Sequence, residues 1–297
     1  MNTNVLNKKK LITSIIFKAI SLIASVYGLV FTIDSIKSFT FFTTLSNVAL
    51  DIVLAVFIVL DVILLTKEKD YKSNGLYILK FLMTLSITLT CLVYMIILGP
   101  TSENGLIGAY LNKYAGSLGV HLIGPVFAIA DFLAFDKGFV AKKIYAIYAV
   151  IPPLCYVAFV YILAALGVRW YDTMTAPYNF LNYAAPTGWF GWDLSQMGSE
   201  SLGIGVVYMI VVLLLIFIGI GLLYLAINGA GRGVKAQQAE KKKRMYEKAV
   251  IAAENRRKKR EKDRRYLETL KNTRYEPTQS VKALLKKNCG IDLDNKN

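Results

Sequence analysis

The chain has 297 residues, of which 55% are hydrophobic and 19% are charged, and its mean hydropathy is +0.45. A soluble globular chain has about 45–50% apolar and roughly 25% charged residues, so this composition excludes intrinsic disorder and small disulfide scaffolds. Residues 1–230 carry 14 Lys and Arg against 11 Asp and Glu, whereas residues 231–297 carry 21 against 9. The net charge of +15 therefore belongs mainly to a basic C-terminal segment that follows a nearly neutral, apolar body.

Six apolar stretches are long enough, or nearly so, to cross a bilayer core of about 30 Å, which takes roughly 20 residues. They are residues 11–33, 39–65, 76–98, 118–135, 144–166 and 204–227. Charged residues are so scarce in them that a soluble helical core is a poor alternative. The sequence therefore predicts an all-α, polytopic integral membrane protein. Residues 1–230 form its six-helix transmembrane domain, and residues 231–297 form a basic cytoplasmic tail with one long helix.

The short connections between the spans indicate the orientation. Nine basic residues precede the first span or lie in the connections after spans two and four: Lys8, Lys9, Lys10, Lys67, Lys69, Lys72, Lys137, Lys142 and Lys143. The connections on the other side contain only Lys37, Lys113 and Arg169. The positive-inside rule then predicts a cell-membrane protein with both termini in the cytoplasm and with residues 99–117 and 167–203 outside.

The outer segment 167–203 is rich in aromatic residues. It contains the three tryptophans of the chain together with several other rings, among them Trp170, Tyr178, Phe180, Trp189 and Trp192. Two interpretations stay open: an aromatic belt at the membrane interface, or a lid over an apolar pocket, formed by Trp170, Tyr178, Phe180 and Trp189. In span five, the pair Pro152-Pro153 predicts a kink.

Polar residues within the spans are expensive in lipid and therefore need an explanation. Lys18, Asp61, Lys80 and Asp131 fall near the cytoplasmic ends of their spans, where snorkelling or an ion pair explains them without a functional role. Asp51 lies near the middle of span two. An ionised carboxylate there costs at least about 2.5 kcal/mol unless it is paired, protonated or hydrated.

Two residues near the predicted outer face have the chemistry of a nucleophile and a base. Thr44 shares one face of span two with Asn47 and Asp51, and His121, the single histidine, lies at a similar depth at the start of span four. A threonine hydroxyl needs a base to take its proton during attack, and imidazole suits that role. The alternative is that His121 only hydrogen-bonds a neighbouring helix. Sequence alone does not show whether spans two and four touch.

No metal or cofactor is expected. One histidine excludes a multi-histidine zinc site, and the three cysteines form no CxxC pattern.

Three short motifs point to a known family. They are Phe-Thr-Thr-Leu-Ser-Asn at 42–47, His-Leu-Ile-Gly-Pro at 121–125 and Tyr-Asn-Phe-Leu at 178–181. In this order they resemble the androgen-induced-gene family of multi-span membrane hydrolases and its bacterial relatives, which cleave fatty-acid esters of hydroxy fatty acids. The resemblance implies that Thr44 is the nucleophile and His121 the base, with Thr43 as the neighbour that a one-residue shift would select. Its supporting polar positions correspond to Asn47 and Asp131, and we add Asp51 to them.

These observations predict a membrane-embedded threonine hydrolase that acts on lipid-like esters. Two other classes stay open. One is a non-enzymatic binding or assembly protein whose basic tail meets anionic lipid, RNA or another protein. The other is a small transporter with Asp51 as a proton or cation site.

Overall fold

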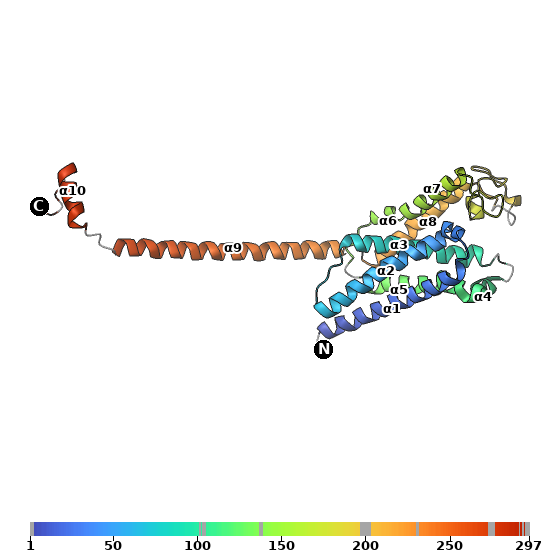
Figure 1. Cartoon of the computed structure of the whole chain (residues 1–297), viewed down its shortest axis with the longest axis horizontal. Helices are drawn as coiled ribbons and strands as arrows, with labels where there is room; N and C mark the ends of the chain where they lie inside the picture. Colours follow the sequence, from blue (N-terminus) through green and yellow to red (C-terminus); the bar gives the residue numbers. More distant parts are fainter. Residues whose placement is uncertain are drawn as a thin grey trace. The chain divides into compact units, whose positions relative to one another are not determined.

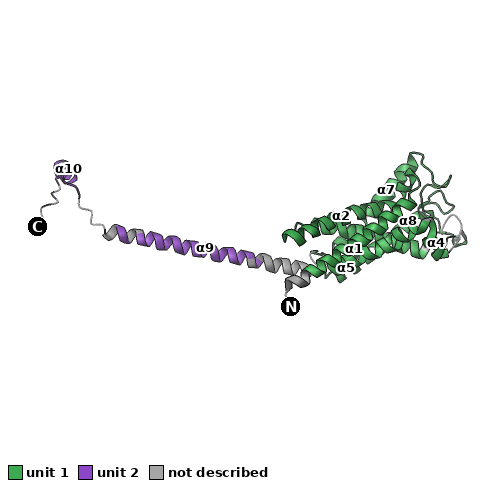
Figure 2. Ribbon diagram, turned by 60° about the horizontal axis from the view of Figure 1, so that its bottom comes forward, with its two compact units in different colours: residues 1–237 green, residues 238–297 purple. Residues whose placement is uncertain are grey.

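The computed structural model describes residues 3–100, 102, 105–136, 139–196, 203–229, 232–272, 277–290, 292 and 294. Within these ranges the chain is helical or irregular, with two isolated β-bridges and no β-strand. Residues 1–237 form one compact unit and residues 238–297 form a second (Figure 2).

The first unit is a bundle of long helices that run side by side (Figure 1). Its α-helices are α1 (Thr3–Thr32), α2 (Phe42–Lys67), α3 (Asn74–Val93), α4 (Gly105–Leu118), α5 (Gly124–Phe135), α6 (Tyr145–Tyr148), α7 (Ile151–Ala165) and α8 (Val206–Ile227). Shorter helical turns are η1 (Ile36–Thr40), η2 (Tyr94–Leu98), η3 (Gly119–Ile123), η4 (Asn179–Leu181) and η5 (Leu194–Gln196).

Six stretches of this unit are long and apolar enough to cross a membrane. They are Lys8–Thr32, Phe42–Lys67, Asn74–Ile96, Tyr114–Phe135, Tyr145–Ala165 and Val206–Ile227. Each overlaps one of the six predicted spans, so the prediction of an all-helical chain with six helices long and apolar enough to cross a membrane is confirmed for the described residues.

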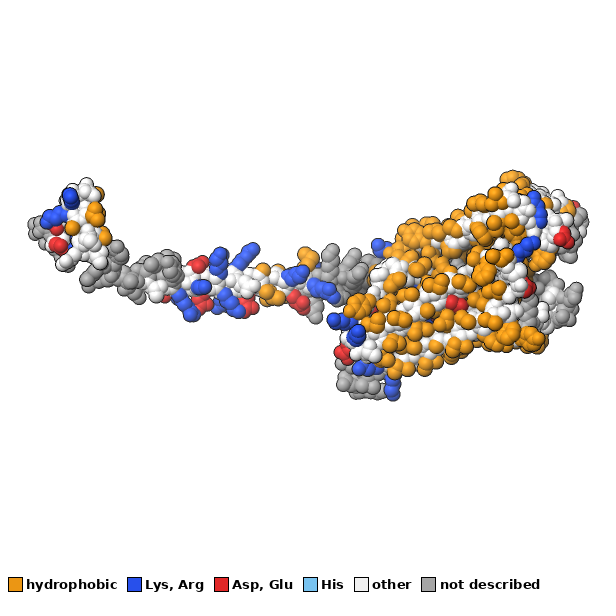
Figure 3. Space-filling model, in the orientation of Figure 1, with side chains coloured by type: hydrophobic (Ala, Val, Ile, Leu, Met, Phe, Trp, Pro, Cys, Tyr) orange, Lys and Arg blue, Asp and Glu red, His pale blue; other side chains and the backbone are white. Residues whose placement is uncertain are grey.

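The exterior of the bundle fits contact with lipid. Apolar side chains cover most of the face of the first unit seen in Figure 3. Of the six stretches, α8 is the least enclosed by the rest of the chain. Only 17% of its most apolar 18-residue segment is buried, and Leu215 and Leu223 are exposed. Monomeric soluble proteins rarely expose apolar surface of this extent.

The fourth span differs from its prediction. The sequence predicts residues 99–117 as an outer connection, whereas the structure has α4 at Gly105–Leu118, interrupted by left-handed φ angles at Tyr114 (55°) and Ala115 (61°), followed by η3 and α5. Gly105 has a left-handed φ of 63°, which places a tight turn immediately before the helix. The turn between α3 and α4 therefore ends at Gly105. Ala109 and Tyr110 are buried because they belong to a helix that packs on the bundle.

The prolines of span five interrupt it, in line with the predicted kink. Helix α6 ends at Tyr148 and α7 begins at Ile151, so that Pro152 and Pro153 lie in the first turn of α7. The N–H groups in the first turn of a helix have no intrahelical partner. A proline in that turn, which lacks an N–H, therefore breaks no hydrogen bond.

Helix α1 joins α2, α5 and η3 through a face of small and polar residues. A Cβ atom at Gly28 would lie only 2.6 Å from the carbonyl oxygen of Gly116, so the two backbones approach closely. On the same face, Ser21 Oγ donates to the carbonyl oxygen of Gly124 over 2.7 Å. These contacts hold the segment from Gly116 to Gly124, which carries His121, against α1.

The basic C-terminal part forms two helices, α9 (Arg232–Asn272) and α10 (Gln279–Cys289). Side chains described on α9 are exposed, and several pair with an opposite charge one turn away, as Arg265 does with Glu261 over 2.8 Å. Helix α10 ends at Gly290, whose left-handed φ of 68° lets its N–H bond the carbonyl of Leu285. The basic segment thus contains a helix of 41 residues, α9.

Candidate functional site

A polar cavity of about 550 Å³ opens at the end of the bundle where α1 ends and α2 begins. Its walls include Thr43 and Thr44 from the first turn of α2, Tyr94 from η2, His121 from η3, and Trp170 and Tyr178 from the segment after α7. The structure therefore brings Thr44 and His121 to one cavity, although they lie on different spans.

The two residues line this cavity without a hydrogen bond to any other side chain that the structure describes. Thr44 and His121 are 7% and 8% exposed, and Nδ1 of His121 is a buried nitrogen with no partner among the described residues. Most buried polar atoms have a partner, so the unpaired Nδ1 is unusual, although this atom is itself buried and not exposed in the cavity.

The position of His121 depends on two π-helical turns. Both η2 and η3 widen their helices by one residue per turn, and such bulges are frequent at functional sites. The imidazole of His121 stacks on the ring of Tyr94, with 3.6 Å between centroids and 11° between planes. Tyr94 thus orients the imidazole, and nothing in the apolar run around it in the sequence indicates that role.

The segment after α7 closes one side of the cavity. Trp170 Nε1 donates to Thr40 Oγ1 over 2.8 Å, which ties this segment to η1, just before α2. The Tyr178 hydroxyl accepts from the N–H of Thr43 at 3.4 Å and lies 3.5 Å from Thr43 Oγ1. Burial raises the pKa of the Tyr178 phenol, so it stays an O–H donor at neutral pH.

A smaller apolar cavity of about 60 Å³ adjoins the polar one. The two share Thr43, Leu98 and Tyr178, and the remaining walls of the small cavity include Tyr156, Phe180 and Leu213. Of the four residues predicted as a lid, Trp170 and Tyr178 line the polar cavity and Phe180 lines the apolar one. Trp189 lines neither, and it stacks instead on Tyr183 with 4.8 Å between centroids.

Asn47 and Asp51 lie deeper along α2 than Thr44. Asn47 is fully buried, and its Nδ2 donates to the carbonyl oxygens of Thr43 at 2.9 Å and Val120 at 3.3 Å. Both amide hydrogens are therefore used, and Asn47 has none left for an oxyanion. Asp51 accepts from Ser25 Oγ over 2.8 Å.

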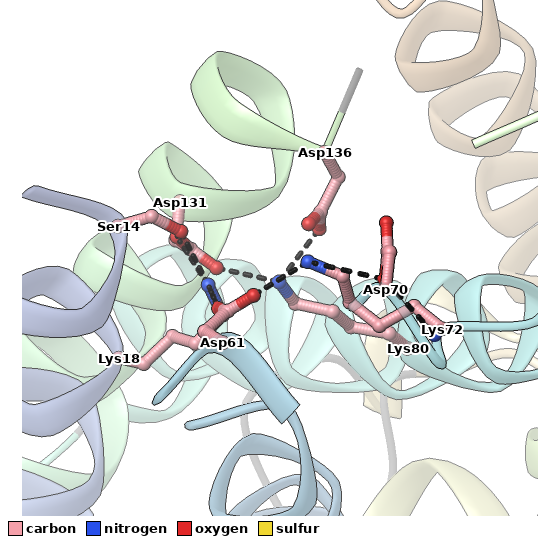
Figure 4. Close-up of polar contacts among 8 residues, drawn as sticks. All are labelled: Ser14, Lys18, Asp61, Asp70, Lys72, Lys80, Asp131 and Asp136. Atoms are coloured by element: carbon pink, nitrogen blue, oxygen red, sulfur yellow. Dashed lines mark hydrogen bonds and ion pairs between the residues drawn. The ribbon is translucent and has the colours of Figure 1, made fainter. Parts of the chain in front are cut away.

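Asp131 belongs to a separate group of charges at the other end of the bundle (Figure 4). We call this group the ion-pair cluster; it consists of Lys18, Lys72, Lys80, Asp61, Asp131 and Asp136. Asp131 lies 3.1 Å from Lys18 and 2.5 Å from Lys80. It lines none of the polar cavity, so its place in the structure is that of an ion-pair partner.

The other charges of the cluster are paired in the same way. Lys18 also lies 2.9 Å from Asp61, Lys72 lies 2.6 Å from Asp61, and Lys80 lies 2.6 Å from Asp136. Three lysines thus face three aspartates, and Ser14 adds a hydrogen bond to Asp131. Such mutual neutralisation is what buried charges need in an apolar environment.

Groups of three or more His, Cys, Asp and Glu side chains that could hold a metal ion are not found in the described part of the chain.

Comparison of the chain with protein-family models, curated proteins and solved structures found no match.

Proposed function

We propose that this protein is a membrane-embedded hydrolase of lipid-like esters, with Thr44 as nucleophile and His121 as base. The observation that carries the proposal is that Thr44 and His121, which come from different spans, line one cavity. The resemblance of motifs 42–47, 121–125 and 178–181 to the androgen-induced-gene family points to the same two residues.

The chemistry proceeds in two balanced steps. In the first, Thr44 Oγ1 forms a bond to the ester carbonyl carbon while His121 takes the hydroxyl proton. The tetrahedral intermediate then expels the alcohol, which receives that proton from His121. In the second step, water attacks the acyl-threonine, His121 again accepts and returns a proton, and the acid leaves.

Tyr178 is the best-placed donor for the oxyanion in this scheme. Its hydroxyl lies at the junction of the two cavities, beside Thr43, whereas the amide hydrogens of Asn47 are already used. A preformed donor of this kind stabilises charge that develops in the transition state. The adjoining apolar cavity gives an acyl chain a place to begin next to the reacting carbonyl.

Neither imidazole nitrogen reaches Thr44 Oγ1 in a hydrogen bond within the described residues. Catalytic hydrogen bonds are often long in an unliganded enzyme and shorten when the substrate is bound. We therefore expect substrate binding to bring the Thr44 hydroxyl and the His121 imidazole together.

The test compares neighbouring threonines. Purified full-length protein is assayed for cleavage of a long-chain acyl ester and for labelling by a fluorophosphonate probe. Thr44→Ala is expected to abolish both signals, whereas Thr43→Ala, its matched control on the same turn, keeps the label on Thr44. Tyr178→Phe is expected to lower kcat more than it changes KM, as loss of a transition-state donor does. Full activity in Thr44→Ala would refute the assignment.

We also propose that the ion-pair cluster faces the cytoplasm and that the polar cavity faces outward, as the basic connections predict. In a variant lacking native cysteines, a cysteine at the exposed Asp172 should react with an impermeant reagent added outside intact cells. Reaction only after lysis would reverse the orientation.

For the second unit we propose binding to anionic lipid through α9. The helix is basic and its described side chains are exposed, and each basic residue near such a surface contributes about 1 kcal/mol. Full-length protein should therefore lose its excess affinity for anionic over neutral vesicles as salt rises towards 1 M, where the screening length is about 3 Å. If the full-length protein instead bound RNA more tightly than anionic vesicles, the partner of α9 would be RNA and not lipid.

A further inference from the structure

Three polar side chains meet in the middle of the bundle, outside the polar cavity. Ser25 of α1 lies between Asn47 and Asp51, which are one turn apart on α2. Ser25 Oγ is 2.9 Å from Asn47 Oδ1 and 2.8 Å from Asp51 Oδ2. Ser25 and Asn47 are almost completely buried and Asp51 is 8% exposed.

The hydrogens available to this group do not suffice for an ionised Asp51. The amide of Asn47 donates both its hydrogens to backbone carbonyls, so Oδ1 is the atom that it presents to Ser25. Ser25 has one hydroxyl hydrogen, yet it faces two acceptors. The second oxygen of Asp51, Oδ1, has no partner within the described chain.

One added proton completes the network. With a proton on Oδ2, Asp51 donates to Ser25 Oγ, and Ser25 then donates to Asn47 Oδ1. When the proton leaves, the Ser25 hydroxyl turns to donate to the carboxylate instead. Ser25 thus has two positions for its hydrogen, one for each protonation state of Asp51.

None of the charged groups on the surrounding helices replaces that proton. The elements that pack most closely against α2 are α1, α3, η1 and η3. The other titratable groups on α2 and on these four elements are Lys8, Lys9, Lys10, Lys18, Tyr27, Lys37, Asp61, Lys67, Tyr77, Lys80, Cys91 and His121, and none is recorded in an ion pair or a hydrogen bond with Asp51. Lys18, the nearest lysine on α1, is two turns or about 10 Å along the axis from Ser25 and pairs with Asp61 and Asp131.

The group also lies between two polar cavities. Val120, whose carbonyl binds Asn47, lines the polar cavity together with Thr44. Towards the other end of α1, Ser14 and Lys18 line a cavity of about 700 Å³ beside the ion-pair cluster. We propose that Asp51 is a reversible proton-binding site within the membrane.

The distances favour a proton over a metal cation. Separations of 2.8–2.9 Å between oxygens are those of hydrogen bonds. Hard cations gather about six or more oxygen ligands, whereas three side chains converge here. The binding step is simple protonation of a carboxylate and release of the same proton, with no change of oxidation state.

The experiment uses full-length protein in detergent and a hydrophobic carbodiimide, which modifies protonated carboxyls in apolar surroundings. Labelling is mapped by mass spectrometry from about pH 9 down to about pH 5, a range in which an ordinary aspartate, with a pKa of about 3.9, stays ionised. Asp51 is expected to be labelled increasingly as the pH falls. Asp51→Asn should remove the label, and its matched control Asp172→Asn, in an exposed turn, should leave it unchanged.

Ser25→Ala tests the two-position hydroxyl. It removes the one donor that the described residues offer to the ionised carboxylate, so labelling of Asp51 should persist to higher pH than in the parent protein. Difference infrared spectra provide a second readout, because Asp51→Asn should delete one protonated-carboxyl band. If the parent protein shows neither the label nor that band at about pH 5, the proposal is overturned.

Protection of Asp51 by sodium at constant pH would also overturn the proposal, because it would make the site one for sodium. Thr44→Ala should keep the pH-dependent label. The labelling experiment therefore tests the proton site at Asp51 independently of the proposed hydrolase activity.

Discussion

The polar cavity and the ion-pair cluster hold polar side chains at opposite ends of one apolar bundle, but their bonding differs. In the cluster, each lysine lies within ion-pair distance of at least one aspartate. At the cavity, His121 Nδ1 has no partner in the described chain, and Thr44 contributes a free hydroxyl.

The contrast separates a structural from a chemical use of polar groups. Buried charges that neutralise one another hold helices together. Buried polar groups without such partners cost stability, and where they surround a cavity they are available to bond a substrate. Four experiments test this division.

The largest effect is expected in the cluster. Lys80→Ala leaves Asp131 and Asp136 facing each other without their shared cation, and breaking a buried pair in this way costs about 3–5 kcal/mol. Denaturant unfolding in detergent measures the loss. Lys80→Met should lose nearly as much, since it restores packing but not charge, while the exposed Lys69→Ala should stay within about 0.5 kcal/mol.

At the cavity we expect the reverse pattern. His121→Ala should reduce ester cleavage by at least about 10²-fold, the contribution of a general base, yet change the free energy of unfolding by less than about 1 kcal/mol. Parallel assays of hydrolysis and unfolding distinguish a catalytic from a structural role of His121. A His121→Ala protein that unfolds easily but cleaves esters at the parent rate would make His121 a structural residue.

A smaller effect should follow from Trp170→Phe. This change deletes the hydrogen bond to Thr40 Oγ1 that ties the segment after α7 to η1, and its loss should cost about 0.5–1.5 kcal/mol. Hydrogen exchange should show faster opening of residues near 170 with little change around Lys80. Equal destabilisation of both regions would mean that the two ends are not independent.

The smallest effect is expected on α9. Glu261→Ala removes an exposed pair with Arg265, and such i,i+4 pairs contribute about 0.3–0.5 kcal/mol. Hydrogen exchange of α9 amides should rise slightly at low salt and not at all at high salt. A loss as large as that of Lys80→Ala would contradict the view that burial gives the cluster its strength.

The sequence by itself determined the six-span architecture, because a bilayer leaves little choice to a run of about 20 apolar residues. Span length and hydropathy are local properties, so they could be read from residues 11–33 onward without any knowledge of packing. The extent of α4 escaped this reading because its few buried residues, such as Ala109, gain their role from contact with other helices.

Only the tertiary structure decided which polar residues belong together. Thr44 and His121 share a cavity because α1 packs against both α2 and η3. The same packing assigns Asp131 to Lys18 and Lys80, and it places Ser25 between Asn47 and Asp51. These groupings depend on contacts between helices far apart in the chain, and the periodicity of a single helix shows only which face is polar, not which helix it meets.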